Sequence, residues 1–442
     1  MGDMGTDAKA YPPERSERNH PRLRPLEFIP VSQQGRAMVA LRDPLGVSEQ
    51  VLLVPRELAS ILGLLDGSYS MRDLQAEVSR RLGRLVFREE LEGFLQTLDD
   101  AGFLETETFR GRLAALQEEF RRSSVRPAFH AGKSYPGEAR ELADWLASLA
   151  VSAGRDEPVA RASGAPSALV APHIDLRLGG AAYVRAYECL DSGAAVDTFV
   201  VLGIGHQGLL ENFSIAGKDF LTPLGRSPLD RELYDEVRAA LGSRRFREDL
   251  THRSEHSIEF QVLWLQHRFR SRPKRILPIL CSFSPQEYQD RAEVRRDVAD
   301  LVAAVQEAAG RLARRVSWIA GVDLSHVGPR YGDPFRPSEA QVRQVLDWER
   351  ELLDCLVEKN VERFARLIVA SGDRTRICGF PALVTLLHAR PEGYGEVLDH
   401  RYAFMDENRS FVTFAAVAYG GRGESGEAEI EAARDSASRS RG

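Results

Sequence analysis

Short apolar segments recur along the second half of the chain, and several of them end in a residue that can do chemistry. The segments SALVAPHI, DTFVVLGIGH, RILPILCS and VSWIAGVDLSH are separated by stretches of helical pattern that are about ten residues long or longer. This alternation of buried strands and helices is typical of a parallel sheet covered by helices. We therefore predict an α/β fold of three layers, with a mostly parallel sheet flanked by helices.

Histidine or aspartate follows three of these predicted strands. His173 comes after the first strand, His206 after the second, and Asp323 and His326 after the third. Ligands of open α/β sheets bind just beyond the carboxyl ends of the strands, so these side chains are expected to converge on one crevice. A single histidine is more often an ordinary structural residue, but repetition at equivalent positions favours a shared site.

Other residues extend this candidate site. Cys378 lies in RTRICGFPALVTLL before a predicted helix, whose N-terminus favours the thiolate form that binds metals. His256 and Glu259 are three residues apart at another helix start and share a face. Asp175 lies two residues after His173 and is either a hydrogen-bond partner of a ligand or a solvated loop charge.

Composition limits the partners and the compartment. The 59 basic and 65 acidic residues give a formal charge of -6, which does not favour nucleic acid or an anionic membrane surface. No apolar run approaches the roughly 20 residues that span a bilayer, and the first residues contain no apolar core of a secretory signal. The four cysteines form no CxxC pair. We expect a soluble cytoplasmic protein with reduced thiols and with no membrane or nucleic-acid partner.

Changes in composition along the chain predict its domains. Both ends are polar, charged and rich in small residues, which is typical of disorder. The predicted order is a disordered N-terminus at 1–24, a small domain at 25–110, a charged helical connector at 111–124, the α/β domain at 125–421, and a disordered tail at 422–442.

Leu45 to Thr108 reads as a strand followed by three helices, which is a winged-helix pattern. This stretch resembles the PqqD-like peptide-recognition domains. It holds six arginines, no lysine and twelve acidic residues, whereas a duplex-binding face needs a basic surface. Peptide or protein docking is therefore favoured over a purely structural appendage, and DNA binding comes last.

The α/β domain resembles the Memo family, also labelled AmmeMemoRadiSam system protein B. The resemblance rests on five segments in order: AGKSYP, APHIDLRLGG, VVLGIGH, HSIEFQVLWL with VDLSHVGPRYG, and CGFPALVTLL. It implies the LigB-like fold of the class III extradiol dioxygenases. It also implies one metal ion held by His173, His206 and Cys378, with Asp323 and His326 lining the same pocket. The family is reported to bind iron or copper.

Two neutral imidazoles and one thiolate suit Fe(II), copper or zinc, and we favour iron. Asp323 is a candidate to accept the second N–H of a ligand histidine, and His326 to act as general acid or base, with Glu259 a weaker candidate. The predicted function is a metal-dependent oxidoreductase or dioxygenase-like accessory to a radical S-adenosylmethionine protein, since this chain has no CxxxCxxC motif of its own. The alternatives are a non-enzymatic metal- or peptide-binding scaffold and hydrolysis by a zinc-bound water. Cys378 as a nucleophile or a redox-sensitive thiol also stays open.

Overall fold

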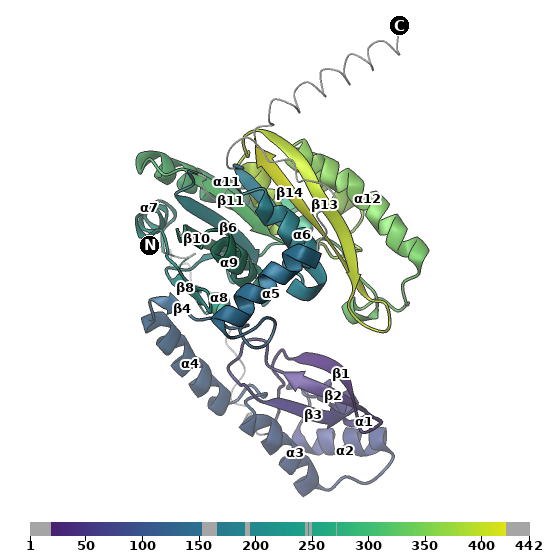
Figure 1. Cartoon of the computed structure of the whole chain (residues 1–442). Helices are drawn as coiled ribbons and strands as arrows, with labels where there is room; N and C mark the ends of the chain where they lie inside the picture. The colour runs from purple at the N-terminus through teal and green to yellow at the C-terminus, as the bar shows by residue number, and fades with distance from the viewer. Residues whose placement is uncertain are drawn as a thin grey trace, which may run out of the picture. The chain divides into compact units, whose positions relative to one another are not determined.

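The structure is a computed structural model that describes residues 19–152, 166–190, 195–243, 246, 250–270 and 272–420. Its contacts divide the chain into an N-terminal unit, residues 1–122, and a C-terminal unit, residues 123–442 (Figure 1). The tail predicted to be disordered, 422–442, lies outside the described residues, as do residues 1–18. None of the helices in the described ranges has the length and apolar character of a membrane span.

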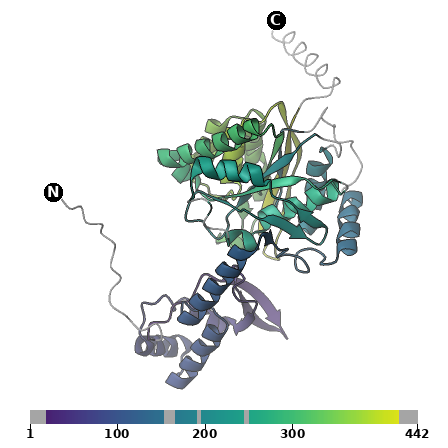
Figure 2. The ribbon, with the colours of Figure 1, turned by 90° about the vertical axis from the view of Figure 1, so that its left-hand side faces the viewer.

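The N-terminal unit, purple to blue in Figure 2, combines a small sheet with helices. Its strands β1 (Glu27–Gln33), β2 (Arg36–Arg42) and β3 (Val51–Pro55) form an antiparallel sheet in chain order. The helices are α1 (Arg56–Leu62), α2 (Met71–Leu82), α3 (Arg88–Asp100) and α4 (Glu107–Arg122). The strand and three helices predicted between Leu45 and Thr108 correspond to β3 and α1 to α3, and α4 contains most of the predicted connector. The peptide-docking role stays a prediction.

Residues 19–24 are part of this unit, so the prediction that they belong to a disordered N-terminus was wrong. Arg24 is buried, its guanidinium lies 2.5 Å from Asp43 Oδ1, and it stacks 4.0 Å from the centre of the Phe109 ring. The backbone N–H of Leu23 donates to the carbonyl of Leu65 at 2.7 Å. The prediction of disorder rested on composition, which does not show that Arg24 pairs with the buried carboxylate of Asp43.

The C-terminal unit contains an eight-stranded sheet with a parallel centre. Strands β5 (Ala168–Ala171), β11 (Val316–Gly321), β6 (Thr198–Ile204) and β10 (Arg275–Cys281) lie side by side and are parallel. Antiparallel strands extend both edges: β7 (Phe213–Ile215) beside β10, and β14 (Phe411–Gly420) beside β5, followed by β12 (His326–Val327) and β13 (Tyr394–Phe404). The predicted α/β fold is confirmed, and the sheet is mixed.

Helices cover both faces of this sheet, which confirms the three layers. Alternate strand residues point to opposite sides, so Ile276 and Leu280 pack in one core while Leu277 and Ile279 pack in the other. The first core is covered by α5 (Ala139–Ser152), α6 (Leu176–Glu188) and α9 (His256–Arg268). The second is covered by α7 (Arg231–Leu241), α10 (Pro285–Asp290), α11 (Ala292–Arg311), α12 (Glu339–Val357), α13 (Val361–Ala370) and α14 (Phe380–His388).

A second, small sheet lies beside the large one. It joins β4 (Val125–Arg126), β8 (Asp219–Thr222) and β9 (Gly225–Ser227), and the one-turn helix α8 (Thr251–Ser254) precedes α9. Because the four central strands of the large sheet are parallel, β5, β6 and β11 all end at the same edge, with Gly321 paired to Ala171. The loops that follow these three strands therefore meet in one place.

Candidate metal centre

His173 follows β5 and is buried, with 2% of its surface exposed. Its backbone N–H donates to Asp323 Oδ1 at 3.0 Å, and its Nδ1 lies 3.0 Å from the carbonyl oxygen of Gly321. A carbonyl only accepts, so Nδ1 carries the proton and Nε2 is the nitrogen that keeps its lone pair. Burial holds the pKa of His173 well below its usual 6.5, so the ring is neutral and suited to bind a cation.

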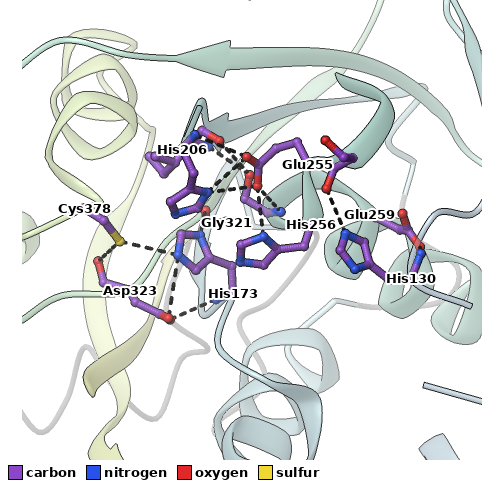
Figure 3. A network of polar contacts seen from close by, with 12 residues as sticks. His130, His173, His206, Glu255, His256, Glu259, Gly321, Asp323 and Cys378 are labelled. Atoms are coloured by element: carbon purple, nitrogen blue, oxygen red, sulfur yellow. Dashed lines mark hydrogen bonds and ion pairs between the residues drawn. The ribbon is translucent and has the colours of Figure 1, made fainter. Parts of the chain in front are cut away.

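His206 follows β6 and is held in the same way by a different acceptor. Its Nδ1 lies 3.0 and 3.1 Å from the two carboxylate oxygens of Glu255 (Figure 3). Burial lowers the pKa of His206, but the Glu255 carboxylate and a hydrogen bond with Cys378 outweigh it and hold this pKa well above 6.5. A cation bound at Nε2 would replace the proton there, while Nδ1–H would stay with Glu255.

Cys378 lies in the loop before α14, whose N-cap is Gly379. Its Sγ lies 3.4 Å from His173 Nε2 and 3.6 Å from the carbonyl oxygen of Asp323. Burial raises the pKa of the Cys378 thiol above its ordinary 9.0. The thiolate form favoured from the sequence therefore stays a prediction for the metal-bound site, where a bound cation would stabilise that form.

These three side chains form a donor set that fits a metal ion. Ligand atoms of His173, His206 and Cys378 all lie within 4.8 Å of one another in the part of the chain that the structure describes. Each imidazole has its second nitrogen bound to a protein acceptor, as in metal sites generally. Two nitrogens and one sulfur, with no fourth protein ligand in this group, match a centre that keeps a position open.

Asp323 lies beside this donor set but contacts it differently from the prediction. Its Oδ1 accepts the backbone N–H groups of His173 and Ile174, at 3.0 and 3.1 Å. Its Oδ2 lies 3.6 Å from His173 Nε2. Burial raises the pKa of Asp323 to about 7. The second N–H of the ligand histidine goes to the carbonyl of Gly321, and Asp323 orients the loop that carries His173.

His326 lies in β12, against the segment that leads to Cys378. Its Nδ1 lies 3.1 Å from the carbonyl oxygen of Leu324 and 3.2 Å from that of Arg376, and its ring meets the Tyr331 ring edge-on at 5.0 Å. Burial lowers the pKa of His326 to about 4. Nε2 of His326 is therefore a neutral acceptor near the Cys378 loop.

The remaining predicted pocket residues separate into two groups. His256 lies at the centre: its ring stacks on that of His206 at 4.9 Å and 16°, and lies 5.1 Å from that of His173. Glu259 lies on the other side of His256 (Figure 3). It is fully buried and pairs with Arg126. We therefore assign Glu259 to this ion pair instead of the acid–base role predicted for it.

Asp175 also lies apart from the ligands. It is the N-cap residue of α6, where its side chain accepts the backbone N–H of Arg177 at 2.9 Å and pairs with the Arg177 guanidinium at 2.7 Å. Of the two interpretations that the sequence left open, the structure favours a loop charge. Asp175 also caps the N-terminus of α6.

Two contributors were missed in the sequence. Glu255 holds the Nδ1 atoms of His206 and His256, and the carbonyl of Gly321 holds that of His173. The position of Glu255 in THRSEHSIEF, directly before a predicted helix, was a signal for a capping carboxylate. Nothing in the sequence indicates that the backbone carbonyl of Gly321 accepts a hydrogen bond from a histidine.

A cavity of about 440 Å³ opens beside Cys378. Its walls are the loop after His206 (residues 208–212), the segment from the end of β10 into α10 (residues 281–287), and the beginning of α14. The cavity is large enough for a small organic molecule. It therefore provides a route to the sulfur side of the centre.

Comparison with known proteins shows which family the chain is similar to. The sequence profile of the Memo-like protein family matches residues 126–420. The chain belongs to the Memo-like protein family. A MEMO1 family protein of Aquifex aeolicus is 28% identical over 399 residues, which cover 89% of this chain and 99% of that protein. Another, of Thermus thermophilus, is 30% identical over 334 residues, 75% of this chain and 93% of the relative.

The Memo-like match ends at Gly420, and only 22 residues follow. The 399-residue match to the Aquifex aeolicus protein must therefore extend into the N-terminal unit. The relative from Pyrococcus furiosus is 28% identical over 243 residues, 54% of this chain and 78% of its own length. The family resemblance drawn from the five sequence motifs is thus confirmed.

Proposed function

We propose that the Memo-like unit is a metal-dependent oxidoreductase whose single ion, iron in preference to copper or zinc, is held by His173 Nε2, His206 Nε2 and Cys378 Sγ. The observation that carries this proposal is the preset donor set: the ligand atoms lie within 4.8 Å of one another, and both imidazoles have Nδ1 bound to the protein. A redox-active ion with an open position supplies binding and activation of an oxidant or substrate.

The residues around the ligands support an enzyme rather than a storage site. Asp323 places a carboxyl oxygen 3.6 Å from Nε2 of His173, and His326 offers an acceptor nitrogen beside the Cys378 loop. These groups are able to hold or accept protons from a molecule bound at the ion, a task that metal storage does not need. A radical S-adenosylmethionine partner and a peptide ligand of the N-terminal unit stay predictions.

The test is elemental analysis of protein purified without oxygen. We expect about one equivalent of iron or copper in the wild type, as for a three-ligand mononuclear site, and almost none in His173→Ala, His206→Ala or Cys378→Ala. His267→Ala is the matched control, because His267 lies on α9 and bonds Arg270 instead of the centre. Wild type without metal would contradict the oxidoreductase proposal and favour a scaffold.

The second part of the test asks what His326 does. We expect His326→Ala to keep the metal and to lose consumption of oxygen, because the imidazole is proposed to contact the bound molecule rather than the ion. Loss of the metal from this variant would instead make His326 a ligand.

A further inference from the structure

We propose that Glu255 is the positioning residue of the metal centre, because one carboxylate holds the Nδ1–H groups of both His206 and His256. This inference rests on the proposed function, since it concerns how the chain prepares those donors for an ion. It adds a residue outside the three ligands that sets how tightly the ion is held.

Glu255 is buried, with 5% of its surface exposed, and its two oxygens are fully used. Oε1 lies 3.1 Å from His206 Nδ1, 3.2 Å from His256 Nδ1 and 2.9 Å from the backbone N–H of Ser257. Oε2 lies 3.0 Å from His206 Nδ1 and 3.3 Å from its backbone N–H. A buried carboxylate with this many N–H donors stays charged and has little freedom to turn.

The contact with His206 decides which nitrogen that ring presents. With Nδ1–H committed to the carboxylate, Nε2 is the nitrogen left for an ion. His173 reaches the same state through the neutral carbonyl of Gly321. An imidazole whose Nδ1–H bonds a charged carboxylate is a stronger metal ligand at Nε2 than one whose Nδ1–H bonds a neutral carbonyl. His206 is therefore the ligand that depends most on its hydrogen-bond acceptor.

The contact with His256 gives the carboxylate a second effect. Held by Oε1 at 3.2 Å, the His256 ring lies parallel to the His206 ring and edge-on to the His173 ring. In Figure 3 it lies between the ligand rings and Glu259, at the N-terminus of α9. The packed ring restricts rotation of both ligand imidazoles, so the donor set is formed before an ion arrives.

Glu255 is itself held in place by the fold. It is the N-cap residue of α9, and its backbone carbonyl accepts from the Arg126 guanidinium at 2.9 Å. The position of the carboxylate is therefore fixed by α9 and by β4, and not by the histidines alone. A different reading of the same atoms is a second metal site, because His206, Glu255 and His256 also group within 4.8 Å.

The experiment compares Glu255→Ser with the wild type. Serine is a preferred N-cap residue, so this variant keeps the start of α9 while it removes the acceptor from both rings. Asp230→Ser is the matched control, since Asp230 is the buried N-cap of α7 and contacts no imidazole. Affinity for Co(II) and the thiolate-to-cobalt absorption band report on the centre without any need for activity.

We expect Glu255→Ser to bind Co(II) roughly 10–100-fold more weakly than the wild type, with a shifted absorption band, and Asp230→Ser to match the wild type. Unchanged affinity in folded Glu255→Ser would overturn the inference. Two equivalents in the wild type and one in the variant would overturn it in favour of the second metal site.

Nuclear magnetic resonance of the metal-free protein separates this inference from the proposed function. We expect a slowly exchanging Nδ1–H proton on His206 in the wild type and its loss in Glu255→Ser, because the carboxylate shields that proton from water. A wild type that binds no metal but shows this proton would refute the proposed function alone. Rapid exchange of this proton in the wild type would refute the positioning role.

Discussion

Replacing Arg126 by methionine is expected to lower the free energy of unfolding of the Memo-like unit by roughly 3–5 kcal/mol, because the change leaves the buried Glu259 charge without its partner. Both side chains are fully buried. Arg126 also donates to the carbonyls of His252 and Glu255, each at 2.9 Å. Urea unfolding monitored by tryptophan fluorescence measures the difference.

The same pair predicts a pH dependence. Burial raises the pKa of Glu259, but the Arg126 guanidinium and further hydrogen bonds outweigh it and hold this pKa below its ordinary 4.5. The stabilisation is therefore complete above pH 4.5 and is lost as the pH falls through the lower, folded-state pKa. The gap in stability between wild type and Arg126→Met should shrink as the pH is lowered, because protonation of Glu259 removes the unpaired buried charge from the variant before it weakens the ion pair of the wild type. A gap that stays constant would show that the lost hydrogen bonds, and not the charge, cause the effect.

Gly321→Ala is expected to destabilise the unit by roughly 1–3 kcal/mol and to weaken metal binding. A Cβ atom at Gly321 would lie 2.6 Å from the backbone oxygen of Ser257 and 2.7 Å from Gln261 Nε2, so β11 and α9 must separate. The carbonyl of Gly321 accepts Nδ1–H of His173, and the shift would misplace that ligand.

Gly310→Ala is the matched control for this second prediction. Gly310 lies in α11 and a Cβ there would meet nothing within 4 Å, so alanine should stabilise the helix by roughly 0.5–1 kcal/mol. Thermal unfolding and Co(II) titration of both variants give the comparison. Equal metal affinity in Gly321→Ala and wild type would show that the loop of His173 does not depend on the end of β11.

The sequence predicted the candidate site best where a histidine or an aspartate follows the end of a predicted strand. Parallel strands bring their carboxyl ends to one edge, so the sequence alone predicts that His173, His206 and Asp323 lie together. Cys378 follows no strand, and its place among the ligands came from the family resemblance. The burial that raises the pKa of its thiol cannot be seen in RTRICGF, because it comes from tertiary neighbours.

Other features depended on partners that are distant in the chain. Glu259 resembled an acid–base group because it shares a helix face with His256, but its partner Arg126 is 133 residues earlier. The β13–β14 hairpin was not predicted, because β14 is buried almost throughout and shows no alternation of polar and apolar residues. The prediction of disorder at residues 19–24 was wrong for the same reason, because the residues that they contact are distant in the sequence.

The position of β14 also sets the order in which the unit is assembled during synthesis. Among the described residues β14 (residues 411–420) is the last strand in the chain, yet it lies between β12 and β5, and β5 leads directly into His173. Until the ribosome releases these residues, β5 has an open edge and β12, with His326, has no strand to pair with. An ion bound as proposed would therefore enter the complete site only after β14 has left the ribosome and paired with β5 and β12.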